Sequence, residues 1–152
     1  MESTIYRFLE VQAENTPEAT FIADLQGAGL SYQGALDQAN RIIERLNTFG
    51  IGRNDRVAIV LPNGPEMAAA FLSIACAAAS APLNPAYRHS EFDFYLSDLE
   101  ARALVTTAGA DSPAVQVART RGIPVLELDP LDNAAAGLFT LRGDRHGEVV
   151  HS

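Results

Sequence analysis

The pattern of apolar and polar residues changes period along the chain, and each change predicts where a strand gives way to a helix. Residues 57–61 are a short, unbroken apolar run rich in β-branched side chains, which is typical of a strand covered on both faces of a parallel sheet. A proline ends this run. Asn63 or Gly64 can then cap a helix whose first turn contains Pro65 and Glu66. This stretch therefore predicts a strand, a turn and a helix.

The helix that follows has almost no polar side. Residues 67–81 carry no charge, and eight alanines between positions 68 and 81 leave it thin enough to pack closely on a sheet. The run is too short to cross a bilayer, because a membrane span needs about 20 apolar residues. We therefore expect a buried core helix, with Cys76 inside it as a small apolar side chain rather than a reactive thiol.

The remaining elements follow from the same two periods. We expect helices at residues 3–15, 32–49, 91–99 and 112–121, strands at 20–25, 81–84, 103–107 and 123–128, and turns at 26–29 and 84–85. Ser3, Ser31 and Ser90 are the predicted N-caps, and Gly50 followed by Ile51 predicts a Schellman-type helix end. Residues 133–137 are expected to be small and flexible, and residues 138–152 to form no complete element.

Strands and helices alternate between residues 56 and 129, which predicts right-handed crossovers and a mainly parallel sheet flanked by helices. The fold class is therefore α/β. We expect this sheet to leave apolar surface uncovered where further strands would normally dock. Such a surface is typical of an incomplete amino-terminal subdomain. We expect residues 1–129 to form this α/β subdomain and residues 130–152 to be a linker or tail.

The composition of the chain argues against several classes of function. The chain has 152 residues, a net charge of -8 and 19 acidic against 11 basic residues, so it would repel a nucleic-acid backbone. One cysteine excludes an internal disulfide, and no secretory signal or membrane span is visible, so the cytoplasm is the expected compartment. All 11 basic residues are arginine. Lysine chemistry, including a Schiff base or a P-loop lysine, is excluded within these residues.

Open parallel sheets bind ligands beyond the carboxyl ends of their strands, which points to the loops at residues 62–65, 84–89, 107–111 and 129–133. None carries a decisive motif. Asn63-Gly64-Pro65 precedes a helix and can present amides to an anion, but it lacks the glycine patterns of nucleotide sites. A simple strand-to-helix turn is the favoured interpretation.

The titratable residues are weak candidates for a site. Glu127 and Asp129 alternate along a strand end, as a metal or ribose site would need, but solvated carboxylates are favoured.

The histidines, His89, His146 and His151, are scattered, and Arg142-Gly143-Asp144 is short enough to occur by chance. The acids Glu91, Asp93, Asp98 and Glu100 are expected on the wet side of one helix, and Asp37–Arg41 and Asp98–Arg102 as ion pairs. We therefore predict no catalytic, cofactor-binding or metal-binding residue.

Several stretches together resemble the amino-terminal part of the adenylate-forming superfamily, which contains acyl-CoA synthetases, luciferases and peptide-synthetase adenylation domains. The stretches are Leu30-Ser31-Tyr32 with Ala39-Asn40-Arg41, GIGRNDRVAIV at residues 50–60, Pro62-Asn63 with Glu66, APLNP at 81–85, and EFDFYLSDLEARALV at 91–105. Gly34 and Ala35 depart from the family pattern, which usually has a glutamate before the leucine, and Asn54 replaces a usual glycine. The amino-acid sequence of these stretches is especially similar to that of the oxalyl-CoA synthetase branch.

This resemblance implies an AMP-forming acid-CoA ligase that uses ATP, magnesium and coenzyme A on a small carboxylic acid. In that family the phosphates are held by a later Ser/Thr/Gly-rich loop with a lysine, toward which residues 130–152 would lead. The resemblance therefore implies a fragment that is inactive by itself, and whose partner is the rest of the synthetase chain. Two alternatives stay open from the residues alone: a non-catalytic α/β interaction module and a small nucleotide-binding module using Asn63-Gly64.

Overall fold

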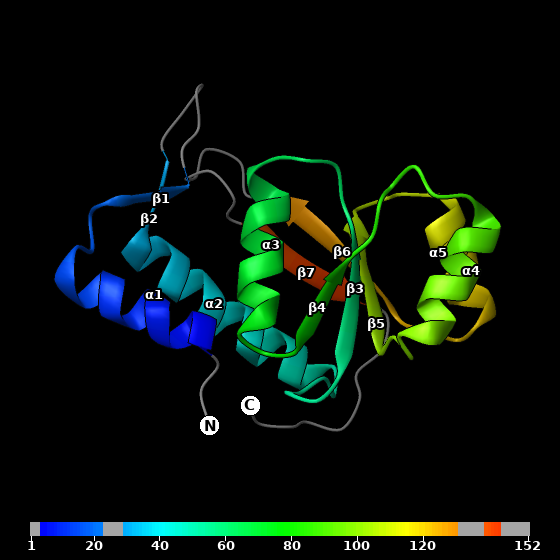
Figure 1. Ribbon diagram of the computed structural model, residues 1–152, viewed down its shortest axis with the longest axis horizontal. Coiled ribbons are helices and arrows are strands. Elements are labelled where there is room, and N and C mark those ends of the chain that lie inside the picture. Colours follow the sequence, from blue (N-terminus) through cyan, green and yellow to red (C-terminus); the bar gives the residue numbers. More distant parts are fainter. Residues whose placement is uncertain (1–3, 23–28, 131–138, 144–152) are drawn as a thin grey trace.

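The structure is a computed structural model that describes residues 4–22, 29–130 and 139–143. In this part of the chain a five-stranded sheet has the order β4-β3-β5-β6-β7 (Figure 1). Its strands are β3 (Arg56–Val60), β4 (Ala79–Pro82), β5 (Ala103–Thr107), β6 (Val125–Pro130) and β7 (Phe139–Gly143). The first four run parallel and β7 runs antiparallel to β6. The predicted α/β class and mainly parallel sheet are confirmed.

Helices cover both faces of this sheet (Figure 1). The helices are α1 (Thr4–Asn15), α2 (Tyr32–Thr48), α3 (Pro65–Ala75), α4 (His89–Asp98) and α5 (Pro113–Thr120). Helices α2 and α3 pack on one face, and α4 and α5 pack on the other. A separate antiparallel pair, β1 (Thr20–Ile22) and β2 (Leu30–Ser31), joins α1 in an outer layer over α2 and α3.

Strand β3 shows why the sheet needs both helix layers. Val57 and Ile59 point into the core shared with α2 and α3, whereas Ala58 and Val60 point into the core shared with α4 and α5. Side chains alternate along a strand, so an unbroken apolar run supplies both cores. The central strand is thus buried on both faces, as the sequence predicted.

Helix α2 begins and ends where its sequence signals place its caps. The Ser31 hydroxyl accepts a hydrogen bond from the Gly34 amide at 3.0 Å. At the other end, the amides of Gly50 and Ile51 donate to the carbonyls of Asn47 and Leu46, both at 3.0 Å, and Gly50 has φ 79°. These are the two bonds of a Schellman motif. Both predicted ends of the helix are confirmed.

The alanine-rich helix is shorter than its apolar run. It ends at Ala75, and β4 begins at Ala79 instead of at position 81. The amide of Ala79 donates to the Asp55 carbonyl at 2.8 Å. Hydrogen bonding to the neighbouring strand therefore begins at the fourth residue after the end of the helix. Alanine permits a longer helix, but the register with β3 ends it.

Helix α4 also starts earlier than expected. Its first residue is His89, and Arg88 occupies the N-cap position, so the predicted cap at Ser90 is wrong. The Glu91 carboxylate accepts a hydrogen bond from the Arg88 amide at 3.1 Å. A glutamate at the third helical position therefore accepts from the amide of the N-cap residue, which is one half of a capping box.

The largest correction is β7, because residues 138–152 were expected to form no complete element. Phe139 and Leu141 are buried, and Thr140 and Arg142 are exposed, which is the alternation of an edge strand packed on one face. Strand β6 also runs from Val125 to Pro130 rather than from 123 to 128. The added residues Asp129 and Pro130 pair with β7.

Both predicted helical ion pairs are wrong. Asp37 accepts a hydrogen bond from Gln33 at 3.0 Å, and Arg41 donates to Gln38 at 2.9 Å. Arg102 donates to the Gly50 carbonyl at 3.4 Å instead of pairing with Asp98. Neutral acceptors closer to each guanidinium replace the expected carboxylates.

The large apolar side chains that are exposed among the described residues lie on helices rather than on the sheet. Phe8 and Val11 of α1 are 47% and 36% exposed, and Phe94 of α4 is 62% exposed. Among the described residues, no helix combines the length and the apolar character needed to cross a bilayer. The predicted cap at Ser3, the turn residues 26–28, the segment 133–137, and His146, His151 and Asp144 lie outside the described residues.

Candidate functional site

The carboxyl ends of the four parallel strands lie along one edge of the sheet, at the top of Figure 1. Three of the predicted loops, after β3, β4 and β5, begin at this edge. The fourth falls at residues 129–133, of which only the first two are described. The topology therefore brings the loops together as expected, and their side chains decide what the edge can bind.

The loop after β3 is closed by the helix that follows it. Gly64 occupies the N-cap of α3, and no side chain caps this helix end. The carboxylate of Glu66 lies in the first turn and Pro65 removes one amide. A negative side chain at the positive end of the helix already interacts with its dipole. The interpretation of Asn63-Gly64-Pro65 as a strand-to-helix turn fits this geometry better than an anion site.

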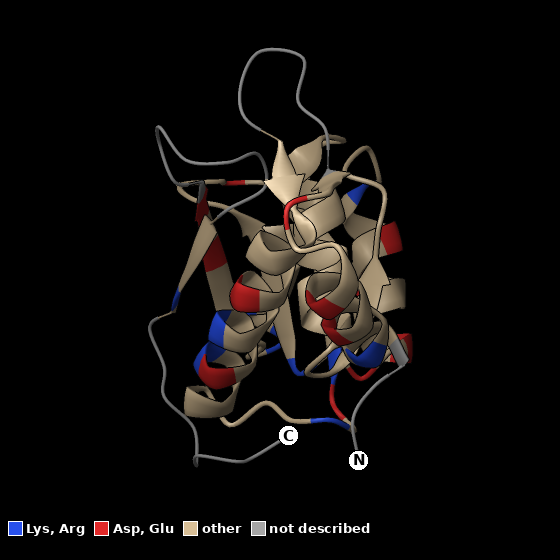
Figure 2. Cartoon of the chain, turned by 90° about the vertical axis from the view of Figure 1, so that its left-hand side faces the viewer, with Lys and Arg blue, Asp and Glu red and all other residues tan. Residues whose placement is uncertain are grey.

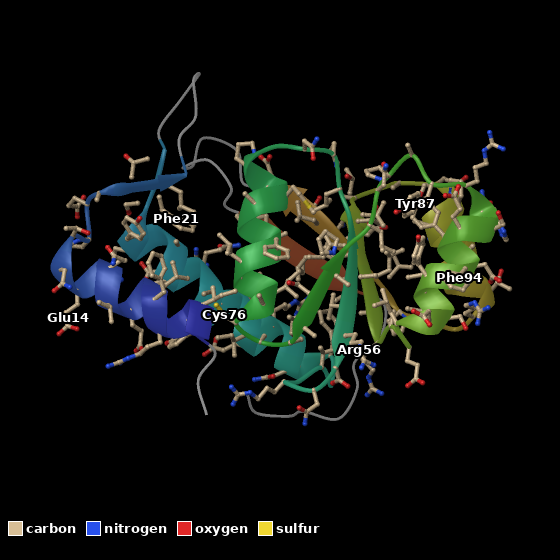
Figure 3. The ribbon with its side chains drawn as sticks, in the orientation of Figure 1. Glu14, Phe21, Arg56, Cys76, Tyr87 and Phe94 are labelled. Atoms are coloured by element: carbon tan, nitrogen blue, oxygen red, sulfur yellow. The ribbon has the colours of Figure 1, made fainter. Side chains whose placement is uncertain are left out.

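The loop after β4 is held by Asn84 and by aromatic stacking. The Asn84 side-chain oxygen accepts from the Ala86 amide at 2.9 Å, which forms the predicted turn. The ring of Tyr87, labelled in Figure 3, stacks on that of Tyr95, with centroids 5.1 Å apart. A hydrogen bond with Tyr95 raises the pKa of the Tyr87 hydroxyl above its ordinary value. The Tyr87 hydroxyl therefore stays protonated at neutral pH.

The loop after β5 is satisfied mainly by backbone bonds. The Ala108 amide donates to Leu128 and the Ala110 amide to Thr107, both at 3.1 Å. The buried hydroxyl of Thr106 donates to the Val60 carbonyl at 3.0 Å. The side chains of Thr107 and Asp111 in this loop are exposed.

Glu127 and Asp129 do face the same way, but they share a basic partner. Arg142 of β7 contacts the Glu127 carboxylate at 3.2 Å and the Asp129 carboxylate at 2.7 Å. One guanidinium therefore holds both acids, which leaves them poorly placed for a metal or a ribose. The sequence argument missed this partner because it assigned Arg142 no structural role.

Asp93 is another acid with a structural role. It is half-buried, and Arg121 of α5 donates to it at 2.9 Å. This hydrogen bond holds the pKa of the Asp93 carboxyl below its ordinary value of 3.8 and raises that of the Arg121 guanidinium. Glu91, Asp98 and Glu100 are exposed, as predicted, whereas Asp93 joins two helices.

The described residues contain no group of three His, Cys, Asp or Glu side chains close enough to hold a metal ion. His89 is exposed at the start of α4. Cys76 is buried as predicted, but it is the C-cap of α3 rather than a residue inside the helix, and its thiol lies 3.3 Å from the Leu72 carbonyl. The acidic and basic residues in the view of Figure 2 are interspersed along the helices. Arg56 lies at the opposite end of the sheet (Figure 3), where it donates to the Leu99 carbonyl.

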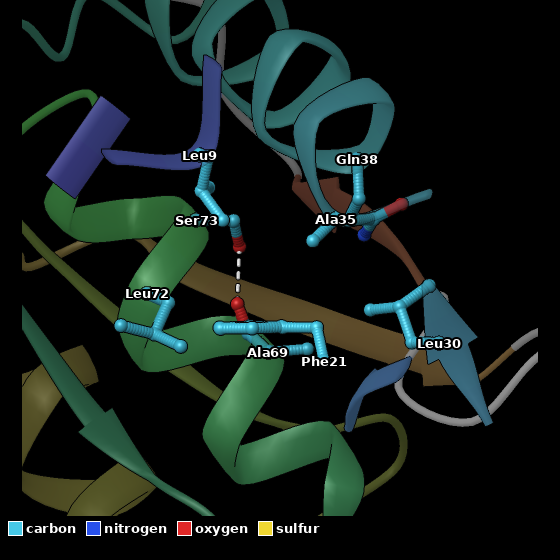
Figure 4. A pocket seen from close by; sticks show the side chains of 8 residues that line it. All are labelled: Leu9, Phe21, Leu30, Ala35, Gln38, Ala69, Leu72 and Ser73. Carbon is cyan, nitrogen blue, oxygen red and sulfur yellow. Dashed lines mark hydrogen bonds between the residues drawn. The ribbon is translucent and has the colours of Figure 1, made fainter. Parts of the chain in front are cut away.

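A small cavity lies between α3 and the outer layer (Figure 4). Its volume is about 10 Å³, and Leu9, Phe21, Leu30 and Leu72 line it with four smaller or polar residues. The Ser73 hydroxyl at its wall donates to the Ala69 carbonyl at 2.6 Å. A volume of this size holds about one water molecule. It therefore has no room for a substrate.

A larger hollow of about 330 Å³ lies between α2 and β7. Three arginines, Arg41, Arg45 and Arg142, stand around it. Sequence reasoning missed it because it assigned no strand to residues 139–143. The signal that was available is the alternation of Phe139 and Leu141 with polar neighbours.

The geometry defines a class of protein, an α/β scaffold with helices on both faces of a mainly parallel sheet. A sequence model of the family described as AMP-binding enzyme matches residues 9–146, and the chain belongs to that family. It is 34% identical over 117 residues to the oxalate–CoA ligase of Arabidopsis thaliana, an alignment that covers 76% of this chain and 23% of that protein.

Solved structures agree with this assignment. A fatty acyl CoA synthetase of Mycobacterium tuberculosis has a TM-score of 0.63 at 26% identity, covering 76% of this chain and 23% of that one. Apo MatB from Rhodopseudomonas palustris has a TM-score of 0.72 at 22% identity, covering 94% and 30%, and shows the fold alone.

These likenesses place the chain in the AMP-binding enzyme family, as the sequence resemblance implied. They do not favour a non-catalytic interaction module or a small nucleotide-binding module. The chain spans about a quarter of the length of the ligase and of the synthetase that it matches.

Proposed function

We propose that this chain is the supporting part of an ATP-dependent acid-CoA ligase. The longer protein would join a carboxylic acid to AMP with release of pyrophosphate, and then transfer the acyl group from AMP to coenzyme A. The family match over residues 9–146, together with 34% identity to an oxalate–CoA ligase, carries this proposal. Oxalate is the first acid to test, because the name of that relative specifies it.

The role of these residues would be to position the reactive groups rather than to supply them. Two polar side chains at the carboxyl edge, Asn84 and Thr106, form hydrogen bonds with the chain itself. A strand such as β3, buried on both faces, holds the position of that edge. Rigid support of this kind keeps a catalytic constellation within its productive geometry.

ATP, magnesium and coenzyme A would be bound by the longer protein. Among the described residues no three metal-binding side chains lie together, and the neighbouring acids Glu127 and Asp129 are both paired with Arg142. We assign no catalytic or cofactor-binding role to any residue of this chain. The proposed partners are the remainder of the synthetase and a small carboxylic acid, and the proposed compartment is the cytoplasm.

We also propose that residues 1–129 are the α/β subdomain and that residues 130–152 lead toward the phosphate-binding loop of the longer protein. Strand β7 falls within the second range and pairs with β6 of the first. The connection to the phosphate loop would then leave the sheet from the outer edge strand.

ATP–pyrophosphate exchange tests the proposed function. The longer protein is expected to exchange labelled pyrophosphate into ATP when oxalate or another acid is present, and the purified 152-residue chain is expected to show only background. The chain contains no lysine to hold the phosphates, so it lacks the cation that the family resemblance implies. Exchange by the 152-residue chain, or an inactive longer protein with every acid of a broad panel, would contradict the proposal.

A further inference from the structure

The hollow between α2 and β7 is distinct from the carboxyl edge of the sheet. Arg41, Ile42 and Arg45 line it from the helix, and residues 139–142 line it from the strand. Its volume of about 330 Å³ is within the range of about 300–1,000 Å³ that small-molecule sites occupy. The groove therefore has room for a small ligand.

Two guanidinium groups in the groove are held by neutral acceptors. The Arg45 Nε donates to the Leu141 carbonyl at 2.8 Å, and its guanidinium carbon lies 4.7 Å from the centre of the Phe49 ring. Arg41, one helical turn earlier, donates to the Gln38 side-chain oxygen at 2.9 Å. Within the described residues, neither guanidinium forms an ion pair. Both retain a full positive charge and N–H groups that these bonds do not use.

The third arginine differs, because Arg142 is already bound to the carboxylates of Glu127 and Asp129. That cluster carries a net negative charge and would repel a ligand with several anionic groups. A single anionic group placed beside Arg41 and Arg45 avoids this repulsion. The charge pattern therefore favours a monoanion.

The base of the groove is apolar. Ile42, Phe139 and Leu141 line it but are each only 2% exposed, so the apolar surface that a ligand can cover is that of the methylene stems of Arg41 and Arg45, which form its walls. A short hydrocarbon group can leave water there while its charged end stays near the guanidinium groups.

We propose that this groove binds a small amphipathic monoanion, a carboxylate that carries a short apolar chain. Arg41 and Arg45 bind the carboxylate, and the hydrocarbon chain lies along the methylene stems of these two arginines. This binding goes beyond the proposed ligase activity and is independent of it, since it needs neither ATP nor the carboxyl edge of the sheet.

Titration of the isotopically labelled 152-residue chain with hexanoate, followed by amide NMR, tests the proposal. Hexanoate is expected to bind with a Kd on the order of 1 mM, a value typical of a ligand of this size, and to shift the amide signals of residues 139–142. Hexanol has the same chain length without the charge and is expected to bind more weakly. Added salt is expected to weaken the binding of hexanoate only.

Variants separate the groove from general surface charge. Arg41→Gln removes an exposed charge and is expected to raise the Kd about fivefold, whereas Arg119→Gln on α5 is expected to leave it unchanged. Thr140→Asp places a repelling charge on the rim and should also weaken binding. Equal binding of hexanol and hexanoate, an unchanged Kd in Arg41→Gln, or no saturable binding would overturn the proposal. Pyrophosphate exchange is not measured, so failure here leaves the ligase proposal standing.

Discussion

Some single positions in this chain tolerate almost no added volume, because one element touches the side chains of another there. A Cβ atom on Gly143 of β7 would lie 2.7 Å from Leu126 and 2.9 Å from the ring of Phe49. A Cβ atom on Gly34 would lie 2.8 Å from Leu30. Both distances are shorter than van der Waals contact, so these glycines permit close packing of α2 against its neighbours.

Gly143→Ala is therefore expected to lower the free energy of unfolding by about 1–3 kcal/mol, which is the usual range for overpacking a core. Thr140→Ala, at an exposed position of the same strand, is the matched control and should change it by less than about 1 kcal/mol. Urea denaturation followed by circular dichroism measures both. Equal stabilities of the two variants would contradict the close packing of Gly143.

The Asp93–Arg121 pair gives stability a defined dependence on pH. Because the pKa of Asp93 is lowered in the folded state, the contribution of the pair is fully present above the ordinary value of 3.8. It is lost as the pH falls further, through the lowered folded-state pKa. Asp93→Asn should therefore be less stable than the wild type at neutral pH.

The difference between Asp93→Asn and the wild type should shrink as the pH is lowered below 3.8. Asp98→Asn, which removes an exposed carboxylate of the same helix, is the control and should show no comparable change. Urea midpoints measured across this pH range check the prediction. A difference that does not vary with pH would show that the pair does not contribute through its charge.

Among the elements, α2 organises much of the fold, because it contacts the outer layer, α3 and the edge strand β7. Its Gln38 and Arg45 side chains donate to the carbonyls of Phe139 and Leu141. These bonds cap two carbonyl groups along the outer edge of the sheet. An edge strand with capped carbonyls offers fewer positions for an incoming strand.

Helix caps give a direct comparison at this scale. Ser31→Ala removes the hydroxyl that accepts from Gly34 and should lower the free energy of unfolding by about 1 kcal/mol. Ser90→Ala should have almost no effect, because Ser90 lies inside the first turn of α4 and does not cap it. Chemical denaturation of both variants distinguishes them, and equal losses would mean that the start of α4 is wrongly placed.

The bond from Gln38 to β7 is buried, with only 1% of the side chain exposed. Gln38→Met should destabilise the chain by about 1–3 kcal/mol, because the Phe139 carbonyl loses its donor away from water. Gln116→Met, at an exposed site of α5, is the control. Hydrogen exchange in β7 should accelerate in Gln38→Met only, and unchanged exchange there would argue against the bond.

As a whole, the molecule has a central sheet with two helix layers and a third, thinner layer made of α1, β1 and β2 (Figure 1). The thin layer packs on α2 through a small apolar cluster around Leu9, Leu30 and Ala39. Fewer large buried side chains lie in this cluster than in the main cores. Its local stability should therefore be lower.

Native-state hydrogen exchange should show this order. Amides of α1 are expected to exchange through openings of lower free energy than those of β3 and β5, whose side chains are almost fully buried. Leu9→Ala should lower protection in α1 first and in the main sheet only through global unfolding. Equal protection throughout would mean that the outer layer opens only with the core.

Sequence reasoning succeeded where a signal is local and repeated. Helix α2 has a serine cap, a glycine stop and a periodic apolar face, although Leu36 and Ile43 are only half-buried while Ile42 is buried. It failed at β7, because the strand has only five residues and its alternation of buried and exposed positions is correspondingly short. It also failed at the end of α3, where alanine fits a helix and pairing with β3 decides the boundary.

At the candidate site, too, local signals could be predicted from the sequence and long-range contacts could not. The carboxyl edge and its loops could be predicted, since parallel strands align their ends. The sharing of Arg142 by Glu127 and Asp129 could not, because the guanidinium arrives from a strand that the sequence did not indicate. The groove beside Arg41 and Arg45 was missed for the same reason.

By itself the sequence determined the α/β class, most elements and the family, because caps, apolar periods and motif spacing are encoded within short stretches of chain. Only the tertiary structure decided which polar groups meet. The bond from Gln38 to Phe139 joins residues 101 positions apart, and that from Arg45 to Leu141 joins residues 96 apart. Contacts over such separations depend on how the sheet is ordered, and no local pattern records that order.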